Sequence, residues 1–261
     1  MSKISVVIPA HRCDKWLDEA VESVLASKGI QPAVVVVLNG TTEMPHSSWM
    51  TSRDVQVLHY AEALGPTIAM IKGIEATHSE FIARLDADDR AHPTRLGKQL
   101  EYLEAHPETP LVGTRVQRIT DDGTFSGKVK MPTGPDVRNH LVLSNTVPHS
   151  TVLIRREALD RAGGYDPELL QMEDYDLILR LAQLGPISVL PEVLVDYRLH
   201  TGQVSRGAKP TGLHINKVVE QRVRLGRSIG MSRVGIWARN ALWRGVQFTR
   251  YYGITKPGHE Y

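Results

Sequence analysis

Three acidic residues directly follow an apolar run of the chain. The run Phe81–Leu85 suits a buried strand, and Asp86, Asp88 and Asp89 come immediately after it. In open α/β sheets, ligands bind beyond the carboxyl ends of the strands, where these acids would lie. Carboxylates at this spacing can converge on a hard divalent cation, which would hold a phosphate-bearing substrate. A plain polar turn explains the same pattern, so the surrounding residues decide between the two interpretations.

Polar residues that could complete such a site stand at three further places. Glu173-Asp174-Tyr175-Asp176 opens an amphipathic segment, His200 follows an apolar run, and Asn145–Ser150 is a polar stretch before another. Each has a simpler explanation. Acids in a first helical turn stabilise the helix dipole, a single histidine is usually structural or merely exposed, and the polar stretch can be an ordinary loop.

The elements that would position these residues alternate between strand and helix. We expect strands in Ile4–Ile8, Ala33–Leu38, Val55–Leu58 and Phe81–Leu85, and helices that begin near Asp14, Pro66 and Pro93. Continuous apolar strands indicate a parallel sheet that is covered on both faces. The first 115 residues therefore predict an α/β, Rossmann-like, doubly wound and mostly parallel sheet of the nucleotide-binding type.

The next part of the chain, to residue 205, predicts a smaller mixed sheet that would receive the second substrate. We expect antiparallel strands around Asp121-Asp122-Gly123, further strands at Ser150–Ile154, Ile187–Leu190 and Val193–Tyr197, and a helix from Glu173 to Leu184. The sequence contains neither a GxGxxG after the first strand nor a GxxxxGK[ST] motif. This argues against dinucleotide oxidoreductases and P-loop NTPases.

Composition limits the class of protein. The chain has 261 residues, of which 41% are hydrophobic and 23% charged, so it can bury a core. A single cysteine, Cys13, excludes an intramolecular disulfide and suits a reducing compartment. No apolar run approaches the roughly 20 residues of a membrane span, and the chain enters a strand pattern at once, without a signal peptide. We expect a cytoplasmic protein, free or peripheral to the inner face of a membrane.

The C-terminal part differs in charge from the rest. Residues 206–261 hold eleven Lys and Arg residues and two acids, whereas residues 1–205 hold 20 and 27. We expect a helical extension with an apolar stripe of Val234, Trp237, Ala241 and Trp243–Phe248, and with Arg239, Arg244 and Arg250 beside it. It can pack on the domain or on a second copy in a homodimer, lie on a membrane surface, or border the acceptor. Charge alone permits nucleic-acid binding, but no binding motif supports it.

In their order and spacing, these motifs resemble the family 2 glycosyltransferases, the inverting nucleotide-sugar enzymes of GT-A fold. The resemblance runs from Ile4 to about Ser205 and includes Ser5–Ala10, Leu85–Asp89, His149–Arg156, Gly163–Asp166, Glu173–Ala182 and the pattern from Tyr197 to Ser205. It implies a GT-A domain over residues 1–205, with a nucleotide-sugar-binding half (1–115) and an acceptor half (116–205). The C-terminal extension (206–261) follows.

The resemblance also implies which residues hold the donor. Asp88 would contact a Mg²⁺ or Mn²⁺ ion that bridges the donor diphosphate. Asp86, beside Ala87, would contact the ribose or the cation. His200 would reach the metal or the diphosphate from the C-terminal side. The loop that borders the nucleotide base would consist of Pro9, Ala10, His11 and Arg12.

The same resemblance implies the chemistry. Asp174 matches the catalytic base, and Glu173 would help to orient the site. The cation would neutralise charge that develops on the leaving diphosphate. The base would take the proton of the acceptor hydroxyl on the opposite face of the sugar, which gives inversion. The acceptor can be a carbohydrate, a lipid-linked glycan or a small molecule.

Two departures from the family pattern concern the nucleotide. Asn39 stands where relatives carry an acid that reads uracil, and its amide can accept a hydrogen bond but also donates. Met70 and Ile71 stand where relatives tend to carry Arg and Asn, with Lys72 as the nearby cation. Uridine is the default donor base, with guanosine and thymidine as alternatives.

Two other functions fit part of this pattern. Nucleotidyl transfer would also use acids and a metal, but it needs a basic phosphate-gripping loop after the first strand, and Pro9–Arg12 is poor in glycine and lysine. A non-catalytic scaffold of the same fold would explain the change at Asn39. A scaffold would have no need of the complete set Asp86, Asp88, Asp174 and His200.

Overall fold

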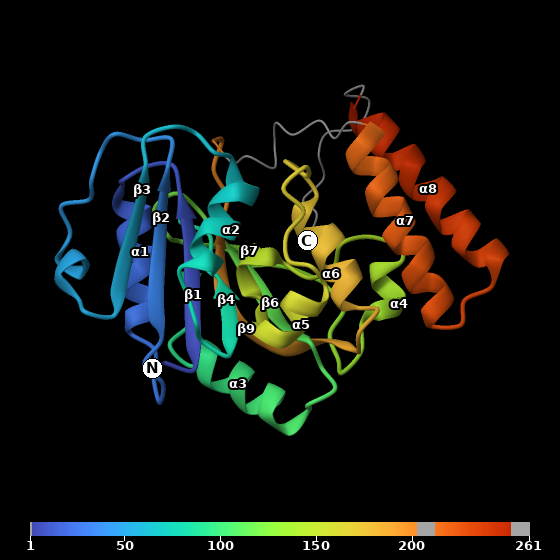
Figure 1. Cartoon of the computed structure of the whole chain (residues 1–261), viewed down its shortest axis with the longest axis horizontal. Helices are drawn as coiled ribbons and strands as arrows, with labels where there is room; N and C mark the ends of the chain where they lie inside the picture. Colours follow the sequence, from blue (N-terminus) through green and yellow to red (C-terminus); the bar gives the residue numbers. More distant parts are fainter. Residues whose placement is uncertain (1, 203–211, 252–261) are drawn as a thin grey trace.

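The structure is a computed structural model and describes residues 2–202 and 212–251. A nine-stranded sheet runs through the molecule in the order β3-β2-β1-β4-β8-β6-β9-β5, with β7 paired to β6 (Figure 1). The strands are β1 (Ile4–Ala10), β2 (Ala33–Asn39), β3 (Val55–Tyr60), β4 (Phe81–Arg84), β5 (Arg90–Ala91), β6 (Leu111–Ile119), β7 (Phe125–Lys128), β8 (Leu153–Arg155) and β9 (Ile187–Arg198).

Strands β1 to β4 form the parallel half that the apolar runs predict. Their side chains alternate between two cores. Val7 faces the core beneath α2 (Pro66–Glu75), whereas Val6 belongs to the core beneath α1 (Lys15–Leu25) and α3 (Arg95–Ala105). The α2 helix packs closely on β1, since a Cβ at Gly73 would stand 2.3 Å from Val7 Cγ1. Burial on both faces explains why β1 and β2 are almost entirely apolar.

The second half of the chain continues the same sheet. Strand β8 runs antiparallel to both β4 and β6, while β6 pairs in parallel with β9 and antiparallel with β7. The turn predicted at residues 121–123 connects β6 to β7. The mixed strands expected after the parallel half are therefore present. Strand β8 joins them to the parallel half, because it pairs with β4 on one side and with β6 on the other.

Several predicted boundaries are wrong. Ile187–Leu190 and Val193–Tyr197 are one strand, β9, which bulges because its pairing skips Pro191 and Glu192. Proline cannot donate to a sheet ladder, and a bulge accommodates it. Residues 149–151 form a 3-10 turn, so β8 starts only at Leu153. The short strand β5, which pairs with β9, has no signal in the sequence.

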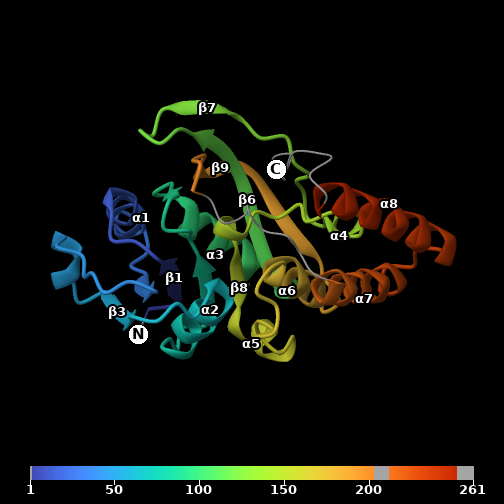
Figure 2. The same ribbon diagram turned by 90° about the horizontal axis from the view of Figure 1, so that it is seen from above.

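The remaining helices cover the second half. They are α4 (Arg138–Leu141), α5 (Arg156–Arg161), α6 (Glu173–Leu181), α7 (Gly212–Ser228) and α8 (Arg233–Tyr251), with 3-10 turns at Ser48–Thr51 and His149–Thr151. The α6 helix ends before Leu184, its predicted end. The expected C-terminal helical extension is confirmed as the hairpin α7–α8, in which α7 packs on α6 and α8 lies at the outer edge (Figures 1 and 2). Residues 203–211 and 252–261 lie outside the described residues. They include Gln203 and Ser205 of the predicted motif that begins at Tyr197, and parts of the predicted extension.

A buried arginine attaches this hairpin to the domain. The Arg222 side chain of α7 is fully buried. It donates hydrogen bonds to the carbonyls of Val142 and Leu143, to the Asn240 side chain and to the Tyr175 hydroxyl of α6. The hairpin is therefore joined to the rest of the domain by a buried network of hydrogen bonds. Within the described ranges, no helix combines the length and the apolar character that crossing a membrane would require.

Candidate active site

The three acids that follow β4 gather at the carboxyl edge of the sheet. One oxygen from each of Asp86, Asp88 and Asp89 lies within 4.8 Å of the others. The backbone fixes this turn: Leu85 N–H donates to Val7 O (3.2 Å), Asp89 N–H to Asp86 O (3.1 Å), and Asp86 N–H to Ser150 Oγ (2.7 Å). The turn is thus held by β1 on one side and by the turn before β8 on the other.

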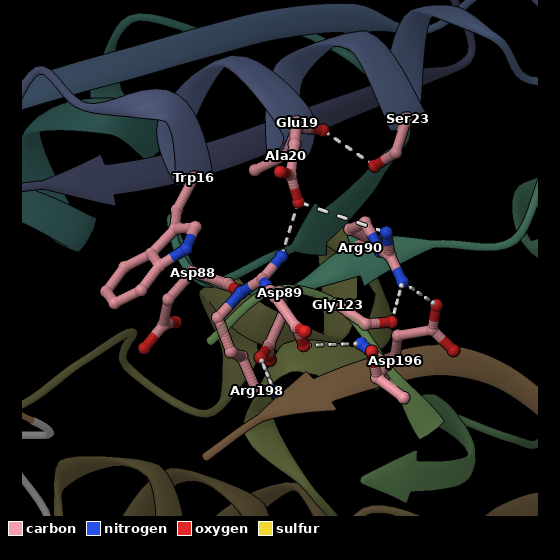
Figure 3. A network of polar contacts seen from close by, with 12 residues as sticks. Trp16, Glu19, Ala20, Ser23, Asp88, Asp89, Arg90, Gly123, Asp196 and Arg198 are labelled. Atoms are coloured by element: carbon pink, nitrogen blue, oxygen red, sulfur yellow. Dashed lines mark hydrogen bonds and ion pairs between the residues drawn. The ribbon is translucent and has the colours of Figure 1, made fainter. Parts of the chain in front are cut away.

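Asp89 faces inward and anchors the turn to β9. It is fully buried, and Oδ1 accepts a hydrogen bond from the Arg198 backbone N–H (2.9 Å). The Arg198 side chain donates to the Asp88 carbonyl (2.8 Å), pairs with Glu19 of α1, and lies 5.4 Å from the centre of the Trp16 ring (Figure 3). This network connects α1, the acidic turn and β9, and it does not use the carboxylates of Asp86 and Asp88.

The chemistry of these acids fits a divalent cation. Burial raises the pKa of Asp86 and of Asp89, and the neighbouring acids raise both further. Asp89 Oδ2 is buried and has no hydrogen-bond partner within residues 2–202 and 212–251. Crowded carboxylates repel one another, and a bound cation would remove that repulsion. Carboxylate oxygens are also the ligands that Mg²⁺ and Mn²⁺ prefer.

His200 meets this cluster through Asp88. Its Nε2 lies 2.8 Å from Asp88 Oδ2, and its Nδ1 accepts a hydrogen bond from the Gly202 backbone N–H (3.2 Å). Because Nδ1 is an acceptor here, the proton of the neutral ring resides on Nε2 and points at Asp88. The ring also packs on Trp16, with 4.6 Å between ring centroids. The structure therefore places His200, the predicted metal ligand, in direct contact with Asp88.

Arg84, the last residue of β4, lies among these carboxylates. Its guanidinium is 2.7 Å from Asp86 Oδ1 and contacts His149 Nδ1. The other ring nitrogen of His149 lies 2.5 Å from the buried Tyr165 hydroxyl. A continuous polar chain thus runs from the core to Asp86. Sequence reasoning missed Arg84, although it stands two residues before Asp86 and is a charge inside an otherwise apolar run.

The second pair of acids opens α6. Met172 precedes the helix with φ 59°, in the left-handed region that a non-glycine residue rarely adopts. Asn145 Nδ2 donates to Asp174 Oδ2 (2.8 Å). Glu173, which we predicted to help orient the site, precedes Asp174 in the chain. Asn145, which the sequence placed in a polar loop, holds Asp174 through this hydrogen bond.

These two groups of acids influence one another. Burial raises the pKa of Glu173 to about 8, with a further contribution from the negative charge of Asp174. Burial also raises the pKa of Asp174. The positive charge of Arg84 opposes the shift in both, and Asp86 adds to that of Glu173. The end of β4 and the start of α6 therefore belong to one electrostatic site.

The loop after β1 borders the same site. Pro9 and Ala10 end the strand, and His11 and Arg12 follow it. Burial lowers the pKa of His11, as does the charge of Arg12, while Asp88 acts in the opposite direction. His11 is therefore close enough to the acidic turn to feel its charge, and Ala87 lies within that turn.

Two of the predicted nucleotide residues are engaged elsewhere. Asn39 accepts a hydrogen bond from the Leu64 N–H (2.6 Å) and donates to Gly65 O (3.2 Å). It thereby ties the end of β2 to the start of α2. Lys72 stands in the last turn of α2 and pairs with Glu75 at 2.8 Å. The start of α2 follows the carboxyl ends of the strands, so Lys72 lies toward the opposite edge of the sheet.

Comparison with known proteins supports the family. Residues 5–163 match the model of Glycosyl transferase family 2. The chain is 28% identical over 218 residues to the O-antigen biosynthesis glycosyltransferase WbnJ of Escherichia coli, over 80% of this chain and 84% of that protein. It is 29% identical over 209 residues to the amylovoran biosynthesis glycosyltransferase AmsE of Erwinia amylovora, over 77% and 78%.

The structural comparison agrees. S. aureus TarS 1-349 in complex with UDP-GlcNAc has a TM-score of 0.71 at 18% sequence identity, over 95% of this chain and 73% of that chain. This likeness, together with the mixed sheet, confirms the predicted GT-A fold. With the match over residues 5–163, these findings show that the chain belongs to glycosyl transferase family 2.

Proposed function

We propose that this glycosyltransferase moves a sugar from a nucleotide-diphosphate sugar to an acceptor hydroxyl, with inversion at the anomeric carbon. One observation carries the proposal. The acids after β4 and the acids at the start of α6 come from separate elements and share one electrostatic site around Arg84. In such an arrangement the acids after β4 can hold the cation and the donor diphosphate. The acids at the start of α6 can supply the general base for the acceptor hydroxyl.

Asp86 and Asp88 would hold a Mg²⁺ or Mn²⁺ ion together with the donor diphosphate. When bound, the cation supplies Lewis-acid stabilisation of charge on the leaving diphosphate. His200 keeps Asp88 oriented, and Arg84 does the same for Asp86. Asp89 connects the turn to β9 and so holds both carboxylates at the edge of the sheet.

Asp174 is proposed as the general base. Asn145 orients its carboxylate with a 2.8 Å hydrogen bond to Oδ2, and Oδ1 is the oxygen proposed to meet the acceptor hydroxyl. The hydroxyl proton moves to that oxygen as the new glycosidic bond forms and the bond to the diphosphate breaks. Glu173, with a pKa of about 8, carries a proton next to the base below that pH and a negative charge above it.

Uridine is the proposed donor base. TarS, which shares the fold, was solved in complex with UDP and with UDP-GlcNAc. The loop Pro9–Arg12 would border the base. Asn39 and Lys72 are left out of this site because their polar groups bind the backbone and Glu75. The relatives WbnJ and AmsE are named for polysaccharide biosynthesis, which favours a carbohydrate or lipid-linked acceptor.

Donor turnover tests this proposal. We would measure nucleoside diphosphate release from a panel of nucleotide sugars with Mn²⁺, using the native chain and Asp174→Asn. The native chain should turn over one donor at a measurable rate, and Asp174→Asn should lower that rate by about 10²- to 10⁴-fold, as expected for loss of a general base. An equal rate in both proteins would contradict the role of Asp174.

A scaffold without activity is the second candidate, because Asn39 is committed to the backbone. Binding separates it from the enzyme. The enzyme should show both donor binding and release of nucleoside diphosphate. A scaffold would show neither, or it would bind a donor and release no nucleoside diphosphate with any donor of the panel.

A further inference from the structure

The exposed face of α8 is apolar. Its outward residues recur at intervals of three and four along the helix, so they share one side. They are Val234, Trp237, Ala238, Ala241, Leu242, Gly245, Val246 and Phe248. Trp237 is 72% exposed, Val234 75% and Leu242 66%. The outer face of a surface helix is normally polar, so this face is unusual for a helix at the edge of a domain.

The buried face of α8 accounts for a different set of residues. Ile236, Asn240, Trp243 and Gln247 are buried against the rest of the protein. Trp243 lies 4.6 Å from the guanidinium of Arg222 and 6.2 Å from the Tyr175 ring. The predicted stripe joined Trp237 to Trp243, and this is wrong because Trp243 is buried against the rest of the protein whereas Trp237 is exposed. The hairpin is already anchored without the outward residues.

Positive charge borders the apolar face. The α8 sequence contains Arg233, Arg239, Arg244 and Arg250 and no Asp or Glu. Arg233 and Arg244 are exposed. The hydrogen bonds of Arg239 and Arg244 go to neutral groups, Gly235 O and Asn216 Oδ1. The face thus offers apolar side chains in the middle with Arg233 and Arg244 beside them, and neither arginine pairs with an acid among residues 2–202 and 212–251.

We propose that the outward face of α8 lies on an anionic membrane surface. Exposed Trp and aliphatic side chains can enter the boundary between headgroups and acyl chains, while arginines at the sides reach the lipid phosphates. A second copy of the chain fits less well. Two such faces packed together would bring arginines from both helices into one interface, and α8 supplies no acid to pair with them.

This placement would determine how the active site faces the membrane. The α7 helix is hydrogen-bonded through Arg222 to Tyr175, the residue that follows Asp174. Both α6 and α7 belong to the same packed core. A membrane bound to α8 would therefore hold the site in a constant orientation toward lipid-linked molecules at the surface. The docking itself does not depend on the proposed sugar transfer and is tested without donor or acceptor.

Vesicle sedimentation with the full chain tests the proposal. We expect binding to vesicles of equal phosphatidylglycerol and phosphatidylcholine, and roughly tenfold weaker binding to phosphatidylcholine alone. Trp237→Ser with Leu242→Ser should abolish binding. Phe125→Ser with Leu184→Ser removes two exposed apolar side chains elsewhere and should leave it unchanged. Arg233→Gln with Arg244→Gln should weaken binding about tenfold at low salt, unlike the matched pair Arg53→Gln with Arg161→Gln.

Two further measurements decide between the occupants. Vesicles with brominated acyl chains should quench part of the tryptophan fluorescence of the native chain and much less that of Trp237→Phe. Light scattering gives the oligomeric state of each protein, and circular dichroism confirms that each variant folds. No binding to anionic vesicles by the folded native chain would overturn the proposal. The proposal would also be overturned if the native chain were a dimer that the Trp237→Ser, Leu242→Ser variant dissociates while this variant still binds vesicles.

Discussion

The guanidinium of Arg84 lies 2.7 Å from the carboxylate of Asp86, and the Arg84 side chain is only 11% exposed. Burial raises the pKa of Asp86, and the positive charge of Arg84 opposes that rise. The same charge opposes the rise at Glu173 and Asp174. One buried cation therefore helps to keep acids from two elements ionised, and its hydrogen bond to His149 fixes its position.

Replacement of Arg84 should lower turnover more than stability. Arg84→Met removes the charge next to Asp86 and should lower kcat/KM by roughly 100-fold, the size expected for one electrostatic contact in a site. Arg84→Lys keeps the charge but loses the planar fork, so it should recover part of the loss. Steady-state kinetics of donor turnover measure both. Arg161→Met, an exposed arginine on α5, is the control. Equal kinetics for Arg84→Met and Arg161→Met would refute this role.

His200 should control the apparent affinity for the metal. Because its Nε2 contacts the Asp88 carboxylate, His200→Ala should raise the Mn²⁺ concentration required for half-maximal activity by about 10- to 100-fold, the loss typical when a residue that holds a metal ligand in place is removed. His200→Gln still has a side-chain donor and should show a smaller change. His46→Ala, at an exposed position, should match the native chain. A Mn²⁺ dependence unchanged in His200→Ala would show that Asp88 needs no such partner.

Glu173 should make the folded state less stable as pH rises. Its pKa is about 8 in the folded protein and about 4.5 when unfolded. Between these values the unfolded state releases the proton while the folded state retains it. The contribution of this group to the free energy of unfolding is therefore fully present below pH 4.5 and falls as pH rises toward 8. Above pH 8 the loss is complete and the contribution no longer changes.

Glu173→Gln cannot ionise and should lack this loss. The difference in unfolding free energy between Glu173→Gln and the native chain, measured with urea from pH 5 to 9, should grow in favour of the variant up to about pH 8 and then level off. Glu157→Gln, whose side chain is 83% exposed, should give a nearly constant difference. If the difference in unfolding free energy for Glu173→Gln were also constant with pH, burial would not raise the pKa of Glu173.

Arg222 should matter for stability rather than for chemistry. Arg222→Met leaves the buried carbonyl of Val142 and the partly buried carbonyl of Leu143 without their donor. Unsatisfied buried groups cost about 1–3 kcal/mol each, so we expect a loss of about 3 kcal/mol in urea unfolding. Arg224→Met removes an exposed pair with Glu220 and should change stability by less than about 1 kcal/mol. Similar losses in both variants would show that the buried network contributes little.

The sequence predicted the parts of this structure that depend on local pattern. Burial on both faces makes β1 and β2 apolar throughout, and this pattern predicted the parallel half. The acidic turn after β4 could be predicted because three carboxylates directly follow an apolar run, at a spacing that can hold a divalent cation. In β9, by contrast, the sequence predicted two strands, and only the pairing with β6 shows that one strand passes through Pro191 and Glu192 as a bulge.

The missed features depend on distant contacts. Arg84 meets His149, which in turn contacts Tyr165, only when β4, the 3-10 turn before β8 and the loop after α5 come together. Asn39 could not be known to bind Leu64 and Gly65, because nothing in its neighbours in the sequence indicates where the loop before α2 will lie. The faces of α8 were misjudged at Trp243, since helical spacing alone does not say which side a second helix covers.

Metal-dependent nucleotide binding tests the central claim most directly. Isothermal titration with UDP, with and without Mn²⁺, would be carried out on the native chain, Asp88→Asn and Asp174→Asn. We predict that the native chain and Asp174→Asn bind UDP when Mn²⁺ is present, and that both lose most of this affinity when Mn²⁺ is removed. Asp88→Asn should bind poorly in either case. UDP binding that is equal in all three proteins and indifferent to Mn²⁺ would contradict a metal-bridged diphosphate site at the acidic turn.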